Sequence, residues 1–351
     1  MAVRILHPAR TGVGPLEAAL LAARLANAAR LAERFRSVGV DDVSVVAEAD
    51  DSATFGERLR RLVDDLPATA GLVVLGSGSV PLATSKDLEA FVGVAASGQP
   101  CALANNRYSA DIVAIGATAV LRDLPALPGD NALPRWLAEV QGFEVSDLRD
   151  RWTLAMDLDS PLDVLLAGGQ PPEGIDTDPV RRAIDALRAT AADSRAELLI
   201  AGRTSAATVA WLERSTAARV RAILEERGLR AATRLALGPG STVRPVRPPR
   251  SVLGLALDHR GPAELGAIVS ELGDAAILDS RVLLAHRLGA DEAASPAAED
   301  RFASDLLLPQ RIVDPWLRQL TAAAVGAPIP ILLGGHSLVG PGIRLLLGER
   351  P

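Results

Sequence analysis

Short apolar runs alternate with segments of helical periodicity along the first half of the chain. The predicted strands are residues 3–6, 41–48, 71–75, 100–103 and 112–115. The predicted helices between them are residues 16–38, 54–66 and 85–96. This alternation is typical of a mostly parallel sheet covered by helices on both faces, so we predict a Rossmann-like α/β fold. Ligands of such sheets bind at the carboxyl ends of the strands, which directs attention to the loops at 7–15 and 76–81.

The pattern changes after the Gly- and Pro-rich run GGQPPEGIDTDP at 168–179, which we interpret as a linker. Beyond it we predict strands at 196–202, 251–258 and 328–335, and helices at 179–192, 205–227 and 262–272. A chain of 351 residues with 48% apolar content can bury two cores. We therefore predict two domains, residues 1–170 and residues 171–351, the second being another α/β or helical domain.

The charge and cysteine content exclude several classes of function. A formal net charge of −6 and a pI near 5.4 argue against nucleic acid or an anionic membrane as the main partner. Cys101 is the single cysteine, which excludes an intramolecular disulfide and a thiolate metal cluster. The N-terminus has no long apolar run, so we expect a cytoplasmic protein. Lys86 is the only lysine, which limits any lysine-dependent mechanism to that residue.

The stretch MDLDSPLDVLL at 156–166 carries the most chemical information. Asp157 and Asp159 are two residues apart on a strand predicted at 151–159, which places both carboxylates on the same face. Hard oxygen ligands of this kind suit Mg²⁺ or Mn²⁺, with phosphates completing the coordination shell. Ser160 and Asp163 form a helix-capping pattern around Pro161, and capping alone accounts for these three residues. It does not account for the two preceding acids.

A family resemblance extends over roughly residues 1–170. The run DLDSPLDVLLAG resembles the closing motif of metal-dependent nucleotidyltransferases with the glycosyltransferase-A type fold, in particular the 2-phospho-lactate guanylyltransferase and molybdenum-cofactor guanylyl- and cytidylyltransferase group. The segment GLVVLGSGSVPLATSKDLEAF is similar to that group's Gly-Asp-x-Pro-Leu segment. The resemblance implies transfer of a nucleotidyl group from a nucleoside triphosphate to a small phosphorylated or hydroxyl acceptor, with Mg²⁺ or Mn²⁺ held by Asp157 and Asp159.

The same resemblance assigns expected roles to further residues. Arg10 and the amides around Gly12 and Gly14 would hold phosphates. The floor of the site would be lined by Ser77, Gly78 and Ser79. Base or acceptor would be contacted by Asn105, Asn106, Arg107 and Asp111. The second domain would complete the acceptor side or form a homodimer.

Two departures from the family pattern leave alternatives open. The lysine of the family's glycine-rich loop is absent, and Ser77 or Ser79 stands where these enzymes carry a metal-binding aspartate. Asp157 and Asp159 could hold the metal alone, or the chain could be a catalytically degenerate nucleotide- or phosphometabolite-binding protein. A nucleotide-sugar-dependent glycosyltransferase is a third interpretation, since the same fold and the same paired acids serve that chemistry.

The second half offers weaker signals. LLGGHSLVG at 332–340 resembles a nucleophile elbow, but Val339 replaces a glycine and no histidine follows Ser337. Acids, arginines and histidines recur in this half, and they could share a polar pocket or lie on an ordinary surface. These candidates are Asp258, His259, Arg260, Asp279, Arg281, His286, Asp300, Arg301 and Asp305.

Overall fold

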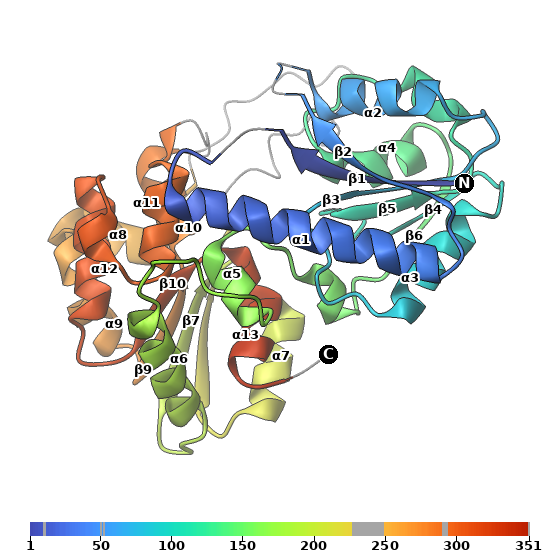
Figure 1. Cartoon of the computed structure of the whole chain (residues 1–351). Helices are drawn as coiled ribbons and strands as arrows, with labels where there is room; N and C mark the ends of the chain where they lie inside the picture. Colours follow the sequence, from blue (N-terminus) through green and yellow to red (C-terminus); the bar gives the residue numbers. More distant parts are fainter. Residues whose placement is uncertain (10–11, 50, 52, 227–248, 290–293, 350–351) are drawn as a thin grey trace, which may run out of the picture. The chain divides into compact units, whose positions relative to one another are not determined.

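The computed structural model describes residues 1–9, 12–49, 51, 53–226, 249–289 and 294–349 (Figure 1). The chain forms two compact units. Unit 1 comprises Met1–Thr11 and Leu21–Leu158, and unit 2 comprises Gly12–Leu20 and Asp159–Pro351. The division thus falls before residue 170, because helix α5 (Pro161–Leu166) packs against α11 (Ala298–Asp305) of unit 2.

Unit 1 contains a six-stranded, mostly parallel sheet with the order β2-β1-β3-β5-β4-β6. Its strands are β1 (Ala2–Pro8), β2 (Asp42–Glu48), β3 (Leu72–Gly76), β4 (Cys101–Ala104), β5 (Ile112–Ile115) and β6 (Glu144–Asp147). Strand β5 runs antiparallel to both of its neighbours. The predicted α/β class is confirmed.

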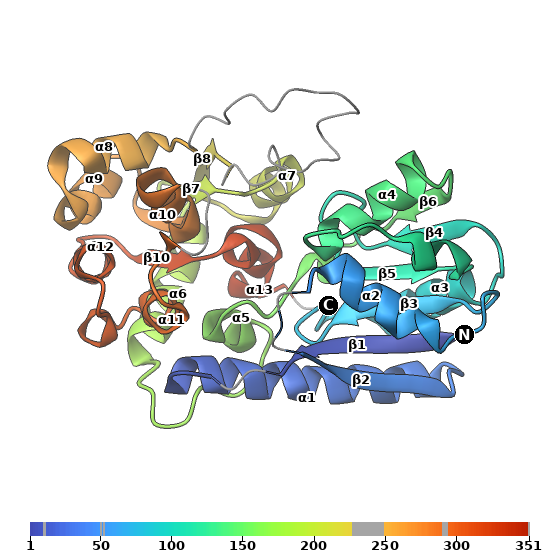
Figure 2. The same ribbon diagram turned by 90° about the horizontal axis from the view of Figure 1, so that it is seen from above.

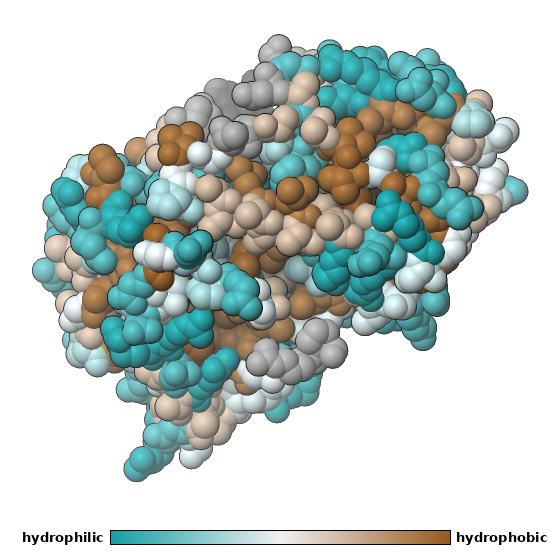
Figure 3. All heavy atoms as spheres, in the orientation of Figure 1, coloured by the Kyte–Doolittle hydropathy of each residue, from teal (hydrophilic) through white to brown (hydrophobic). Residues whose placement is uncertain are grey.

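Helices cover both faces of this sheet (Figure 1). The helices are α1 (Pro15–Ser37), which begins in unit 2, α2 (Phe55–Asp64), α3 (Ser85–Ala95) and α4 (Leu133–Glu139). Side chains of α1 and α3, among them Phe35 and Phe91, share one core cluster with Ile5 and Leu75 of the central strands. Capping boxes at Thr54 and Thr84 start α2 and α3, close to where the sequence pattern predicts helices to begin. In Figure 3, hydrophilic residues cover much of the outer surface of α2.

The prediction of a strand at 151–159 is wrong. Residues Trp152–Ala155 form the 3₁₀ helix η3, and Asp157 makes only an isolated antiparallel bridge with Ser79. The physical reason is that this backbone bonds locally and to a loop: Leu154 N donates to the Arg151 carbonyl at 3.0 Å, and Leu158 N donates to the Gly78 carbonyl at 3.0 Å. Without a strand at 151–159, the argument that Asp157 and Asp159 share one strand face no longer holds.

Unit 2 contains a four-stranded, all-parallel sheet with the order β10-β9-β7-β8. Its strands are β7 (Glu197–Gly202), β8 (Arg219–Leu224), β9 (Ala275–Asp279) and β10 (Ile331–Gly334). Besides α5 and α11, its helices are α6 (Asp178–Ala191), α7 (Ala206–Ser215), α8 (Val252–Arg260), α9 (Leu265–Ser270), α10 (Ser280–Leu288), α12 (Pro315–Val325) and α13 (Ile343–Leu346). The second unit is therefore α/β, one of the two classes predicted for it.

Two elements of unit 2 differ from the prediction. The helix predicted at 205–227 ends at Ser215, and β8 follows as an edge strand paired with β7. The strand predicted at 251–258 is helix α8, capped by Ser251, with Leu253 and Leu257 buried at helical spacing. Short apolar runs fit either element, and here the neighbours decide: β7 supplies backbone partners to β8, whereas α8 lies beside α10 (Figure 2).

The predicted linker at 168–179 lies inside unit 2 and leads into α6, which has Pro179 in its first turn as the sequence indicates. The run GPGSTVRPVRPPRS at 238–251 is rich in Gly, Pro and Arg, and its composition predicts a second flexible stretch. Its residues up to 248 lie outside the described part of the chain. Across the described part of the chain, no helix combines the length and apolar character needed to cross a membrane.

Candidate functional site

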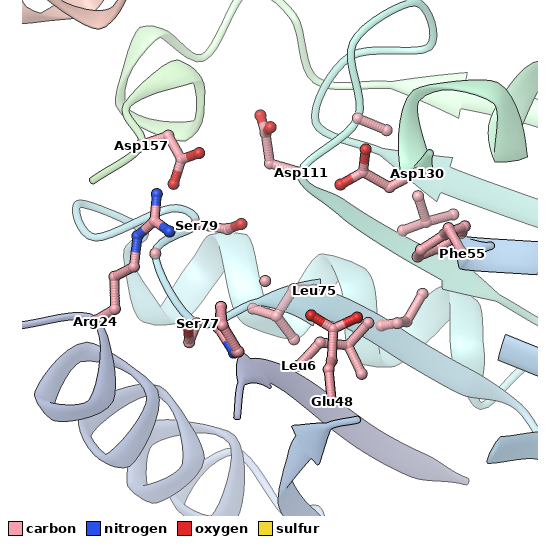
Figure 4. Close-up of a pocket in the computed structure, with 16 residues that line it drawn as sticks. Leu6, Arg24, Glu48, Phe55, Leu75, Ser77, Ser79, Asp111, Asp130 and Asp157 are labelled. Atoms are coloured by element: carbon pink, nitrogen blue, oxygen red, sulfur yellow. The ribbon is translucent and has the colours of Figure 1, made fainter. Parts of the chain in front are cut away.

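A cavity of about 200 Å³ opens at the carboxyl ends of β1 and β3 (Figure 4). From β1 the chain passes to β2 on one side and then to β3 on the other, so strand order reverses at this point. Such a reversal is where open α/β sheets bind their ligands. The cavity is lined among others by Arg24, Glu48, Ser77, Gly78, Ser79, Asp111, Asp130 and Asp157.

The loop Ser77-Gly78-Ser79 forms part of the cavity wall, where the resemblance expects the floor of the site. The buried amide of Asn27 holds this loop by donating to the Ser77 carbonyl at 2.9 Å and the Ser79 carbonyl at 3.1 Å. A Cβ at Gly78 would lie 2.9 Å from Arg24 Nε and 3.1 Å from Asp157 Oδ1. The glycine therefore allows a cation and a carboxylate to approach the same stretch of backbone.

Asp157 lines the cavity, and its backbone is held by the bridge to Ser79. Arg24 Nε donates to the Leu158 carbonyl at 2.7 Å, which fixes the chain just after Asp157. Asp159 belongs to unit 2, where its Oδ2 lies 3.6 Å from His336 Nδ1 and both side chains are 42% exposed. The joint metal site of the two aspartates stays a prediction. Within the described ranges, no group of three or more His, Cys, Asp or Glu side chains could hold a metal ion.

Asp111 lies at the cavity because Asn105 positions it. The buried Asn105 amide donates to Asp111 Oδ2 at 2.7 Å and to the Leu154 carbonyl at 2.9 Å, and its oxygen accepts from Asp111 N at 2.9 Å. These hydrogen bonds give Asn105 a structural role, and its contact with base or acceptor stays a prediction. Asn106 and Arg107 do not line the cavity: Asn106 Oδ1 accepts from the Tyr108 amide, and the Arg107 amide donates to Asp147.

The predicted phosphate loop lies partly outside the described residues, since Arg10 is not among them. Gly12 and Gly14 belong to unit 2 and precede α1. The first amides of α1 donate to the carboxylate of Glu299, from Leu16 N at 3.1 Å and from Glu17 N at 3.1 Å. A Cβ at Gly14 would lie 2.4 Å from that carboxylate. The anion at this helix terminus is thus a side chain of the protein, where the resemblance expects a phosphate.

His7, which the sequence analysis did not select, contacts the Ser77–Ser79 loop but is not among the described residues that line the cavity. It lies at the end of β1, and its Nδ1 is 3.0 Å from Ser77 Oγ. Burial lowers the pKa of His7 below its usual value of 6.5, the charge of Arg24 lowers it further, and Glu48 opposes the shift. The shift therefore favours the neutral imidazole. The sequence could have indicated His7, because it follows the predicted strand at 3–6 and the carboxyl ends of parallel strands meet at one edge of the sheet.

The cavity is acidic. The described residues that line it include the carboxylates of Glu48, Asp111, Asp130 and Asp157 and the guanidinium of Arg24. Carboxylate oxygens bind Mg²⁺ and accept hydrogen bonds from hydroxyl and amino groups, but they repel bare phosphate. This lining favours a metal-bound ligand with hydroxyl or amino donors.

Unit 2 has a corresponding strand-end cluster, built from ion pairs. Strand order reverses between β7 and β9, and there Arg203 donates to both oxygens of Asp279, at 2.6 and 3.1 Å. Arg281, the second residue of α10, donates to both oxygens of the fully buried Asp305, at 2.9 and 2.6 Å. The charges of these four side chains are paired with one another, which indicates a structural role for the pairs.

A neutral acid lies next to this cluster. Burial, reinforced by the charge of Asp159, raises the pKa of Asp163 to about 8, although Ser160 Oγ donates to its Oδ2. Its other oxygen, Oδ1, has no hydrogen-bond partner in the structure. The capping role predicted for Ser160 is confirmed, since its side chain accepts from the Asp163 amide.

Of the other candidates in the second half, Arg301 acts on this cluster, since its charge opposes the rise that burial causes in the pKa of Asp305, whereas His286 and Asp300 have other partners. His286 accepts from Ser251 N at 3.0 Å through Nδ1 and pairs with Asp258 at 2.9 Å through Nε2, so it joins α8 to α10. Asp300 accepts from the amides of Val313 and Asp314. These contacts hold loops and helices together.

Comparison with known proteins yields no match to this chain, either among protein-family models or among curated proteins.

Proposed function

We propose that unit 1 is a nucleotidyltransferase-like domain that binds a nucleotide with Mg²⁺ or Mn²⁺ at the carboxyl ends of β1 and β3. The observation that carries this proposal is the cavity at the reversal of strand order, where Asp111, Asp157 and the Ser77–Ser79 loop meet. The resemblance of the sequence to nucleotidyltransferases supports the same interpretation.

The residues present fit a divalent metal. Asp111 and Asp157 present hard oxygen donors to one cavity, and Mg²⁺ is typically held by one or two carboxylates together with substrate phosphates and water. When bound, the metal neutralises charge on the phosphates. The cavity is smaller than the roughly 300–1,000 Å³ of pockets that enclose whole drug-sized ligands, so it holds one part of a nucleotide. Its carboxylates suit the hydroxyl and amino groups of the nucleoside part.

The proposed reaction is attack of an acceptor oxygen on the α-phosphorus of a nucleoside triphosphate, with pyrophosphate leaving. The protein contributes by positioning the reactants and by placing Arg24 near developing negative charge. Binding without turnover is the second candidate function. It is favoured by the neutral hydroxyl of Ser77 or Ser79 at the position where the resembled enzymes carry an acid; the backbone of Ser79 bridges that of Asp157.

The decisive experiment is calorimetry of the full chain with ATP, GTP, CTP and UTP, each with and without Mg²⁺, alongside an assay of pyrophosphate release. We expect metal-dependent binding that is lost in Asp157→Asn and in Asp111→Asn. Release of pyrophosphate distinguishes a transferase from a binding protein. The proposal fails if the wild-type chain binds none of these nucleotides.

Asp159→Asn provides a matched comparison, because it makes the same chemical change two residues away in the other unit. Equal losses in Asp157→Asn and Asp159→Asn would support the shared metal pair that the sequence predicts. A loss confined to Asp157→Asn would locate the metal at the unit 1 cavity.

A further inference from the structure

Unit 2 contains a cavity of its own, with a volume of about 370 Å³, formed by α5, α6, α13 and the start of the segment that follows α5 (Figure 1). None of the four ion-paired side chains of the strand-end cluster lines it. Its volume falls in the range of roughly 300–1,000 Å³ that is typical of pockets for small molecules. The side chains along its wall therefore indicate which class of small molecule it fits.

One part of this wall is apolar. It is formed by Leu165 and Leu166 of α5, Ile184 of α6 and Leu345 of α13. The last three of these side chains are buried, so packing in the interior of unit 2 fixes their positions. Hydrocarbon that lies against such a surface leaves water, which favours binding.

The rest of the wall carries charge from one face of α6, where Arg181, Asp185 and Arg188 follow one another at helical spacing. Arg188 is held within the protein: its Nε donates to the Leu346 carbonyl at 2.6 Å, and its Nη1 donates to Asp185 Oδ1 at 3.2 Å. This pairing uses the carboxylate of Asp185, and the three charges together leave the wall with an excess of one positive charge.

Arg181 is the residue of this wall that can bind an anion. Its Nε donates to the buried Thr177 Oγ1 at 3.1 Å, which orients the guanidinium, and no carboxylate of the described residues pairs with it. It is the fourth residue of α6, whereas Arg188 lies in the last turn, so the helix dipole also favours an anion beside Arg181. A guanidinium matches the two oxygens of a carboxylate, and the nearby Asp185 disfavours a doubly charged anion.

We propose that this cavity binds a small amphipathic carboxylate, with the carboxylate on Arg181 and the hydrocarbon against Leu165, Ile184 and Leu345. The inference goes beyond the proposed function, since the site lies in unit 2 and no step of nucleotidyl transfer uses it.

The test is calorimetry of the full chain with sodium octanoate, sodium butanoate and octan-1-ol as probes. We expect one octanoate site per chain. Affinity should rise by about fourfold for each methylene added between butanoate and octanoate, because each one is removed from water. Octan-1-ol has the same hydrocarbon without the charge and should bind more weakly than octanoate.

Arg181→Gln and Arg182→Gln form a matched pair of variants. Both remove one positive charge from neighbouring exposed positions of α6, but only Arg181 lines the cavity. Arg181→Gln should weaken octanoate binding by about tenfold or more and leave octan-1-ol binding unchanged, because hydrogen bonds to the carboxylate are lost. Arg182→Gln should bind both probes as the wild type does. Thermal unfolding of the two variants verifies that each is folded.

Three results would overturn the proposal: no binding of octanoate at millimolar concentration, equal octanoate affinity in Arg181→Gln and the wild type, or equal affinity for butanoate and octanoate. Octyl phosphate at pH 8 tests the preference for a single charge, and tighter binding of this dianion than of octanoate would overturn the assignment to a carboxylate. Nucleotide binding is measured with other ligands at the cavity of unit 1. A failure here is therefore distinguishable from a failure of the proposed function.

Discussion

The carboxyl ends of the two sheets use polar side chains in different ways. In unit 1, carboxylates and serines line a cavity at the reversal of strand order. In unit 2, the corresponding positions of β7 and β9 carry Arg203 and Asp279, which bind each other, and Arg281 binds Asp305 in the same way. Charged residues at a strand end therefore indicate a ligand site more strongly where they line a cavity than where they form buried ion pairs with one another.

The largest expected effect comes from breaking a buried ion pair of unit 2. Asp305→Ala leaves the charge of Arg281 buried without its partner and should lower the free energy of unfolding by about 3–5 kcal/mol. Urea denaturation measures the change. The control is Asp185→Ala, which breaks an exposed pair with Arg188 and should cost about 0–1 kcal/mol. Similar values for both variants would contradict a structural role for the buried pair.

The matching change in unit 1 should affect binding as well as stability. In Gly78→Ala the new methyl group meets Arg24 and Asp157, so the cavity wall must shift, with an expected loss of about 1–3 kcal/mol of stability. Nucleotide affinity should fall along with it. Gly93→Ala in α3 is the control, because nothing lies near its added methyl group and alanine favours a helix. Calorimetry and thermal unfolding of both variants test this difference, and an unchanged affinity in Gly78→Ala would count against the site.

The pH dependence of stability should report the neutral acid beside the ion pairs. The pKa of Asp163 is about 8 in the folded chain against 3.8 in the reference state, so between these values the folded state binds a proton that the unfolded state has lost. This group therefore lowers stability as pH rises through that window, by up to about 1.4 kcal/mol per pH unit.

Asp163→Asn replaces the neutral acid by a neutral amide and should flatten this slope. Denaturation midpoints between pH 5 and pH 8 measure it, with the exposed Asp193→Asn as the control. If the wild type and Asp163→Asn show the same slope, Asp163 is ionised in the folded protein.

The smallest expected effect concerns the start of α1. Glu299→Gln removes the negative charge that faces the first amides of this 23-residue helix and should cost about 0.3–1 kcal/mol, because an anion there interacts favourably with the helix dipole. Glu213→Gln, on an exposed position of α7, is the control. Thermal unfolding at low ionic strength would show the difference, and a stabilised Glu299→Gln variant would mean that the carboxylate is strained there.

Local patterns in the sequence determined most of the elements of this protein. The helix starts at Thr54, Thr84 and Ser160 were predictable because a capping residue and its partner amide are three residues apart. The α/β class followed from the alternation of apolar runs with helical periodicity, which depends on burial along each element. The Ser77–Ser79 loop was located because the carboxyl ends of parallel strands meet at one edge of the sheet.

Only the tertiary structure decided which polar residues meet. His7 and Ser77 are 70 residues apart and adjacent only because β1 and β3 pair, while Glu299 reaches the start of α1 from a position 283 residues beyond Leu16. The apolar runs of β8 and α8 took their form from their neighbours, and Asp157 and Asp159 fell in different units although one residue separates them. Hydrogen bonds and ion pairs between distant segments depend on how the elements pack. The spacing of residues along the chain does not determine that packing.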